Sequence, residues 1–208
     1  MYNIGSNVSN KQKQLIDKYV ELINYKIEKN LEGRKFTNLI GSLMENALRK
    51  MVQEQLKNTE TRAEKCFVKD NEGGFTEHDI VLFRKGRENQ EMSEIFNTLV
   101  VDSKDVEAIV EVKSFADTTG LNQFTNFLRQ CNLVERGYFV GIAGSIKGVN
   151  RGVDVNKRPR IFILAKFSGY ANIKRKQRMQ KDKVKDNPGV LEQFLKTMQE
   201  ELVNIRSL

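Results

Sequence analysis

Two short apolar runs in the second half of the chain constrain its fold more than any other feature. Residues 138–143 and 161–167 are almost entirely apolar. Runs of this length and composition suit β-strands that are covered on both faces, as in a sheet with helices on each side. They therefore predict an α/β fold rather than a helical bundle or a half-exposed antiparallel sheet.

The rest of the chain supplies helices and further strands for such a sheet. Apolar residues that recur at three- and four-residue steps indicate amphipathic helices, and alternating or glycine-bounded apolar segments indicate strands. The helices are predicted over 11–29, 37–57, 121–134 and 190–205, and the additional strands over 75–83 and 106–113.

These elements predict one α/β domain with a mixed central β-sheet flanked by helices and with extra helices at both termini. No repeat, low-complexity tract or Pro/Gly/Ser-rich linker marks a second domain. We expect a helical N-terminal segment over 1–36, an α/β core over 37–170, and basic and amphipathic helices over 171–208.

The bulk composition excludes several classes of protein. No apolar run approaches the roughly 20 residues that a membrane span needs, and the first residues lack the order of a secretory signal, so we expect a cytoplasmic protein with no membrane contact. The two cysteines, Cys66 and Cys131, cannot form a standard structural zinc site with the single histidine, His78. We expect both to be free, buried thiols.

The net charge of +8 is unevenly distributed along the 208 residues. Residues 147–185 contain 13 Lys or Arg and two Asp, a local charge of +11 that leaves −3 for the rest of the chain. Such a cationic region attracts polyanions, with nucleic acid as the natural partner. Judged from charge alone, a solvent-exposed charged helix that keeps the protein soluble is an equally good explanation.

A candidate site follows from the side-chain alternation of two strands. Glu111 and Lys113 project from the same face of 106–113, about 6–7 Å apart along the backbone. In 75–83, Asp79 lies on the face opposite to that of His78, Ile80 and Leu82, so we expect His78 to be structural. If the two strands pair, Asp79 can lie beside Glu111. Two carboxylates and an amine that converge in this way can bind a divalent cation and orient a water for phosphodiester cleavage.

The segments Glu77-His-Asp79-Ile-Val-Leu and Ala108-Ile-Val-Glu111-Val-Lys113-Ser resemble the acidic strand and the E-x-K strand of the PD-(D/E)xK nuclease superfamily, whose fold is restriction-endonuclease-like. Gly41-Ser-Leu-Met-Glu45 resembles the helical Gly-x-x-x-Glu that often precedes them. The chain is similar to uncharacterised bacterial nuclease-like domains with an I-E-V-K-S-type strand. The resemblance covers residues 41–144, half of the chain.

The resemblance implies an α-β-β-β-α-β core and dependence on Mg²⁺ or Mn²⁺. It implies that Asp79, Glu111 and the Val112 carbonyl bind the metal, that Glu45 binds it directly or through water, and that Lys113 is the water-orienting base. Three features depart from the commonest pattern. No proline precedes Asp79. Glu77 is an additional acid that could be an accessory ligand. Gln123 is similar to the helical glutamine of some exonucleases, but Phe127 stands where a tyrosine is expected.

The leading hypothesis is a DNA endonuclease that acts on double-stranded DNA in restriction or phage defence, with a homodimer as a candidate assembly. An inactive nuclease fold that serves as a nucleic-acid-binding or assembly module is the first alternative, and an RNase or toxin that uses the same site is the second. The cationic side chains predicted to contact phosphates are Lys157, Arg158, Arg160, Lys174, Arg175, Lys176 and Arg178.

Overall fold

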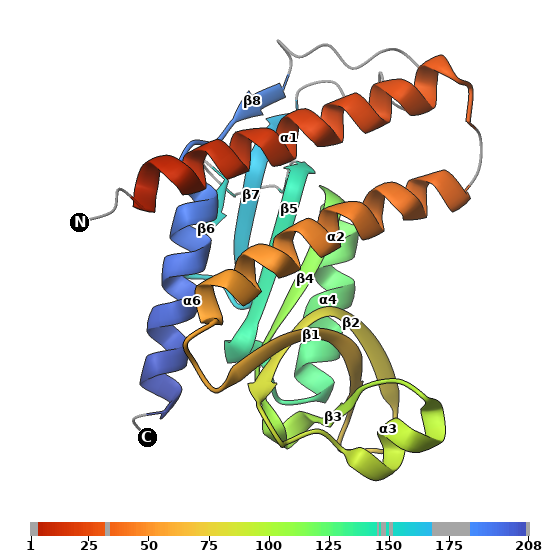
Figure 1. Cartoon of the computed structure of the whole chain (residues 1–208), viewed down its shortest axis with the longest axis vertical. Coiled ribbons are helices and arrows are strands. Elements are labelled where there is room, and N and C mark those ends of the chain that lie inside the picture. The colour runs from red at the N-terminus through yellow and green to blue at the C-terminus, as the bar shows by residue number, and fades with distance from the viewer. Residues whose placement is uncertain are drawn as a thin grey trace.

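The computed structural model describes residues 4–31, 34–144, 146, 149, 152–167 and 184–206. Two long helices open the chain and are followed by an antiparallel pair of strands, a small lobe and the central strands of the sheet (Figure 1). The helices are α1 (Ile4–Glu28), α2 (Arg34–Leu56), α3 (Gln90–Phe96), α4 (Thr118–Gln130) and α6 (Val190–Arg206), with short 3-10 turns over Ser103–Asp105 and Val134–Arg136.

Within these described ranges, the strands form one mixed sheet of eight strands with the order β3-β1-β2-β4-β5-β7-β6, and β8 pairs with β7. The pairs β4·β5, β5·β7 and β1·β3 are parallel, and the other pairs are antiparallel. The bounds are β1 (Thr61–Lys69), β2 (Phe75–Arg84), β3 (Val100–Asp102), β4 (Val106–Ala116), β5 (Gly137–Gly144), β6 (Val153–Asp154), β7 (Arg160–Phe167) and β8 (Val184–Asp186).

The predicted fold class is confirmed. In chain order, α2, β1, β2, β4, α4 and β5 give the α-β-β-β-α-β core that the resemblance implies. The two apolar runs form β5 and β7, which lie side by side within the sheet and are buried on both faces because helices cover them. All eight predicted helices and strands are present, with ends that differ by a few residues, except that α1 begins at Ile4, seven residues before its predicted start at Lys11.

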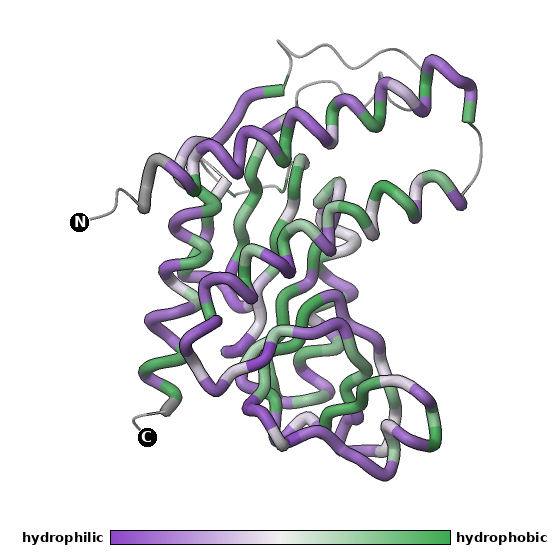
Figure 2. Tube along the Cα trace, viewed as in Figure 1, coloured by the Kyte–Doolittle hydropathy of each residue, from purple (hydrophilic) through white to green (hydrophobic). Residues whose placement is uncertain are grey.

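The sheet separates two apolar clusters. On one face, α1, α2 and α6 pack against the strands, and residues such as Tyr19, Leu48 and Phe194 join Val140 and Leu164 in a single cluster. The other face is covered by α4, and its cluster contains the two buried, free cysteines, as expected. Figure 2 shows apolar residues concentrated in the central strands and alternating with polar residues along the helices. The terminal helices therefore help to bury the same core as the sheet.

In the part of the chain that the structure describes, four strands and one helix were not predicted. Strand β1 interrupts its alternation with the adjacent charged residues Glu64 and Lys65, and strands β3, β6 and β8 are only two or three residues long. Helix α3 is a single short helix of seven residues that leaves Ile95 and Phe96 exposed. Among the described residues, no helix combines the length and the apolarity that crossing a membrane requires.

Candidate active site

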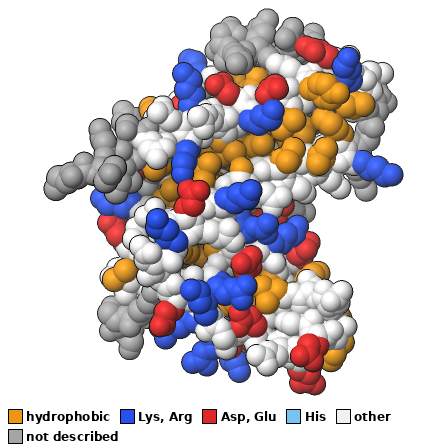
Figure 3. All heavy atoms as spheres, in the orientation of Figure 1, with side chains coloured by type: hydrophobic (Ala, Val, Ile, Leu, Met, Phe, Trp, Pro, Cys, Tyr) orange, Lys and Arg blue, Asp and Glu red, His pale blue; other side chains and the backbone are white. Residues whose placement is uncertain are grey.

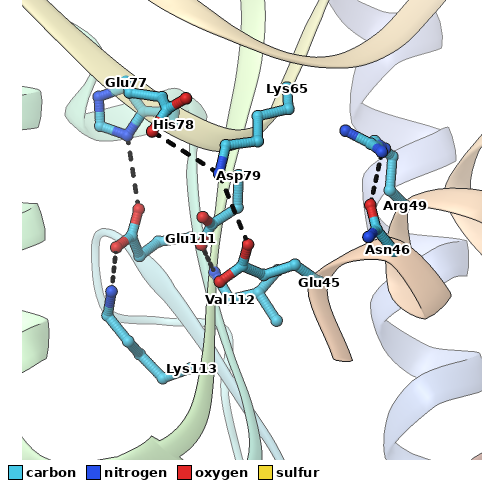
Figure 4. Close-up of polar contacts among 10 residues, drawn as sticks. All are labelled: Glu45, Asn46, Arg49, Lys65, Glu77, His78, Asp79, Glu111, Val112 and Lys113. Carbon is cyan, nitrogen blue, oxygen red and sulfur yellow. Dashed lines mark hydrogen bonds and ion pairs between the residues drawn. The ribbon is translucent and has the colours of Figure 1, made fainter. Parts of the chain in front are cut away.

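The centre of the sheet brings the three predicted site residues together. Strands β2 and β4 are antiparallel with Ile80 opposite Val110, and this register carried one residue further places Asp79 opposite Glu111. The backbone N–H of Val112 donates a hydrogen bond of 2.9 Å to Oδ2 of Asp79 and ties the acid to the neighbouring strand. Lys113 lies two residues after Glu111 on β4, and its ammonium donates to Oε1 of Glu111 (Figure 4).

Glu111 is held at both of its carboxylate oxygens. Oε1 accepts a hydrogen bond from Lys113, and Oε2 lies 3.4 Å from Nδ1 of His78. Burial alone would raise the pKa of Glu111, but the hydrogen bond from His78 and the positive charge of Lys113 outweigh it, so the pKa is lowered. Glu111 is therefore the ionised acid of the site.

Asp79 has the opposite electrostatic environment. Burial, together with the negative charges of Glu111 and Glu45, raises its pKa from 3.8 to about 7, although the Val112 N–H and the Lys113 charge lower it. In Figure 4, the Asp79 carboxylate lies between those of Glu111 and Glu45. Three carboxylates that converge in this way repel one another unless protons or cations are bound between them.

Lys113 is positioned by the helix that follows its strand. Asp117 caps the first turn of α4 by accepting the Gly120 N–H at 2.8 Å. A Cβ at Gly120 would lie 3.7 Å from Cε of Lys113, so the lysine stem runs along this turn. Burial would lower the pKa of Lys113, but Glu111, Asp79 and Glu45 raise it. Lys113 is therefore a protonated ammonium in this arrangement.

Glu45 reaches the site from α2, as the Gly41–Glu45 segment predicted. Its pKa is raised by burial, and the charges of Lys65 and Lys113 partly oppose this shift. Lys65, on β1, was missed by the sequence analysis. Its ammonium lies 3.8 Å from Oε2 of Glu45 and 3.6 Å from Oε2 of Glu77, so it bridges the helical acid and the accessory acid. Lys65 belongs to no motif, and only the recognition of β1 as a strand beside β2 could have suggested its place.

A β-bulge alters the faces of β2 at the site. Glu64 pairs with Val81 but Cys66 pairs with His78, so the single residue Lys65 lies opposite two residues of β2, Asp79 and Ile80. A bulge of this kind redirects the side chains beside it. The prediction that His78 shares a face with Ile80 is therefore wrong.

Instead, the His78 ring packs on Phe127 of α4, with ring centroids 4.1 Å apart. Ile80 lies in the cluster on the opposite face, beneath α1, α2 and α6. The bulge thus brings the histidine to the same side of the sheet as Glu111, close enough to contact it.

The donor set fits a hard divalent cation. Asp79, Glu111 and the carbonyl of Val112 would supply the oxygen ligands that Mg²⁺ or Mn²⁺ prefers, and Glu45 lies within electrostatic reach of them. Within the described ranges, no three His, Cys, Asp or Glu side chains form a preassembled metal site. In this arrangement both Glu111 oxygens are in contact with other side chains, Oε1 with Lys113 and Oε2 with His78.

No protein-family model matches the sequence, and no curated protein matches it significantly. The structure is similar to solved structures of NucC. The cAAA-bound form from P. aeruginosa ATCC27853 gives a TM-score of 0.45 at 14% identity, covering 70% of this chain and 65% of that one. The cAAA-bound form of E. coli MS115-1 NucC gives a TM-score of 0.34 at 16% identity, covering 75% of this chain and 60% of that one. The apo form of the same protein gives a TM-score of 0.32 at 17% identity, covering 73% of this chain and 59% of that one. The chain thus spans less than two thirds of each NucC chain.

The cationic residues predicted to contact phosphates fall into two groups. Lys174, Arg175, Lys176 and Arg178 lie outside the described residues. Lys157 forms an ion pair with Asp154, and Arg158 forms one with Glu135.

Arg160 does not belong to an exposed cationic surface. It is only 6% exposed, its guanidinium pairs with Glu201 and donates to the Glu135 carbonyl at 2.6 Å, and it lies over the ring of Tyr138. This environment argues against the predicted phosphate contact at Arg160, because its charge is already paired inside the fold.

Gln123, the other accessory candidate, is exposed on α4. Among the described side chains, no hydrogen bond connects it to Asp79, Glu111 or Lys113.

Proposed function

We propose that the chain is a metal-dependent nuclease that hydrolyses phosphodiester bonds, with double-stranded DNA as its substrate. The observation that supports this most strongly is the position of Asp79. Its carboxylate accepts a hydrogen bond from the Val112 N–H and lies near the carboxylates of Glu111 and Glu45. The ammonium of Lys113 donates to that same Glu111. An exposed Glu-Lys pair on a strand would not raise the pKa of a neighbouring aspartate in this way.

Each residue has a defined role in this proposal. Asp79, Glu111 and the Val112 carbonyl hold Mg²⁺ or Mn²⁺, and Glu45 contributes directly or through a water. The metal, when bound, polarises the phosphate and lowers the pKa of a bound water. Lys113 orients the attacking water and neutralises the charge that develops on the phosphate.

The protonation of Lys113 bears on its role. Its pKa is raised by the same carboxylates that would ligate the cation. A cation held by those carboxylates would offset the charges that raise the Lys113 pKa, so Lys113 could release its own proton to solvent and then, as a free amine, take one from the attacking water. Without the cation, it acts only as a fixed positive charge.

Three charged side chains at the site are partly exposed to solvent. The side chains of Lys113 and Lys65 are 38% and 37% exposed, and that of Glu77 is 51% exposed. Figure 3 shows charged side chains of both signs gathered below the apolar surface of the first two helices. Lys157, Arg158 and the cationic 174–178 segment remain the proposed contacts to the DNA backbone.

Cleavage assays with defined substrates test the proposal. Plasmid DNA, single-stranded DNA and RNA are incubated with the purified protein and Mg²⁺ or Mn²⁺, with EDTA as the metal-free control. We expect plasmid nicking or linearisation that requires metal and that is lost in Glu111→Gln and Lys113→Met. Glu91→Gln and Lys104→Met remove the same charges at exposed positions away from the site and should cut normally.

The possible results separate the alternatives. Cutting of RNA alone would identify the RNase alternative. DNA binding without cutting under either metal would identify an inactive nuclease fold. Full activity in Glu111→Gln, with folding verified by circular dichroism, would refute the site.

A further inference from the structure

His78 lies behind Glu111 in the fold. Its side chain is 4% exposed and lies between the sheet and α4. The ring packs on Phe127 at 4.1 Å between centroids and has Phe124 at 6.3 Å. Nδ1 forms a long hydrogen bond of 3.4 Å with Oε2 of Glu111.

Packing does not explain a histidine at this position. A carboxylate only accepts hydrogen bonds, so Nδ1 carries the proton that faces Glu111. Among the described residues, the buried Nε2 has no hydrogen-bond partner. An orphaned polar atom in an aromatic pocket lowers stability, and a phenylalanine would fill the same space without that cost. The feature that only histidine supplies here is the donor on Nδ1.

The two groups that hold Glu111 differ in rigidity. Lys113 is a flexible side chain that is 38% exposed, whereas the His78 ring is fixed by its aromatic neighbours and the bulged strand. A cation that takes Oε1 of Glu111 must displace the Lys113 ammonium from that atom. The contact with His78 at Oε2 is unaffected by this exchange and continues to fix the carboxylate.

We propose that His78 is a positioning residue that holds Oε2 of Glu111, so that Oε1 is the oxygen offered to the metal. This inference rests on the proposed function, because it requires Glu111 to be a ligand. Partners that orient a ligating side chain in this manner commonly contribute 10- to 100-fold to metal affinity.

Three variants at one position isolate the donor. His78→Phe keeps the aromatic packing and removes both nitrogens. His78→Asn places an amide N–H near the position of Nδ1, and His78→Gln places it near that of Nε2. Mn²⁺ affinity is measured by calorimetry and by the electron paramagnetic resonance signal of free Mn²⁺, without substrate. Thermal unfolding in EDTA verifies that each variant is folded.

We expect His78→Phe and His78→Gln to weaken Mn²⁺ binding roughly 10- to 100-fold, and His78→Asn to regain most of the affinity. In a Glu111→Gln background, His78→Phe should cause no further loss, because the histidine acts only through that carboxylate. A folded His78→Phe that binds Mn²⁺ like the wild type, or equal losses in the Phe and Asn variants, would overturn the positioning role.

Failure of the underlying ligand set gives a different result. If Glu111→Gln alone leaves Mn²⁺ affinity unchanged, then Glu111 is not a ligand, and both the proposed metal site and the role of His78 are wrong. If Glu111→Gln weakens binding but His78→Phe does not, only the role of His78 is wrong. The single-variant affinities therefore separate the two conclusions.

Discussion

Replacing Asp79 by asparagine should make the metal-free protein more stable at high pH while abolishing cleavage. The asparagine side-chain oxygen can still accept the hydrogen bond from the Val112 N–H, which measures 2.9 Å to Asp79. The substitution therefore removes the buried negative charge and keeps the local geometry. Without a metal, that charge faces the carboxylates of Glu111 and Glu45 and is a net cost to the folded state.

The size of this effect follows from the pKa of Asp79. Its pKa is 3.8 in an unperturbed chain and about 7 in the folded protein. Because the folded state keeps a proton that the unfolded chain has released, stability falls as the pH rises through this interval. Between pH 5 and pH 7, the pH lies between these two pKa values, and each pH unit there costs about 1.36 kcal/mol. Above pH 7 the loss levels off, so the wild type should lose roughly 2–3 kcal/mol of unfolding free energy between pH 5 and pH 8.

Neighbouring acids do not obscure this dependence. The pKa of Glu111 is lowered from 4.5, so its contribution to stability is lost only at pH values below that window. The pKa of Glu45 is raised, but Glu45 is present in both proteins and its effect largely cancels in the comparison. The difference between the two pH profiles thus reports chiefly on Asp79.

Urea unfolding in EDTA at pH 5, 6, 7 and 8 measures the effect. The free energy of unfolding of Asp79→Asn should decline less with pH than that of the wild type, and the gap should widen up to about pH 7. Glu77→Gln removes a charge from the same region but from an exposed side chain, and its profile should follow the wild type. Parallel profiles for the wild type and Asp79→Asn would refute the electrostatic account of the site.

Three further outcomes are expected. Lys113→Met should lower the single-turnover cleavage rate at saturating Mg²⁺ by about 10²- to 10⁴-fold, with Mn²⁺ affinity no weaker than that of the wild type because the competing ammonium is gone. Glu45→Gln should raise the Mg²⁺ concentration needed for half-maximal cleavage by several-fold in a metal titration, because one of the acids that attract the cation is removed. Arg160→Met should lower the free energy of unfolding, measured in urea, by about 2–3 kcal/mol. This loss is smaller than for a fully buried ion pair because Glu201 is partly exposed. The same variant should bind DNA with unchanged affinity in a filter-binding assay.

The sequence predicted the elements whose patterns are regular and strong. The runs that form β5 and β7 are apolar because helices cover both faces, and such runs are rarely anything but strands. Helices α2 and α4 bury one stripe each, so their periodicity is visible without knowledge of their partners. Asp79, Glu111 and Lys113 were placed together because two neighbouring strands in register leave little freedom in where their side chains lie.

The missed features depend on tertiary context. Strand β1 has two adjacent charged residues, Glu64 and Lys65, which pair with Arg62 and Glu77, so its sequence resembles a polar loop. Arg160 lies in a cluster of basic residues along the sequence, yet Glu201, some forty positions later, neutralises it inside the fold. Counting charges along the chain cannot distinguish a buried ion pair from an exposed cationic surface.

The bulge in β2 shows most clearly where sequence reasoning stops. In a regular strand, neighbouring side chains point to opposite faces, so His78 and Asp79 could not both approach the same glutamate. The extra residue opposite Lys65 breaks that alternation. His78 therefore contacts Glu111 through Nδ1, while the carboxylate of Asp79 lies close enough to interact with the charge of Glu111. Neither glycine nor proline marks the position, and the local sequence reads as an ordinary strand. The pairing of β1 with β2 therefore brings both His78 and Asp79 to Glu111. Only the folded chain reveals this pairing, and it distinguishes the site from a strand with an exposed acid and lysine.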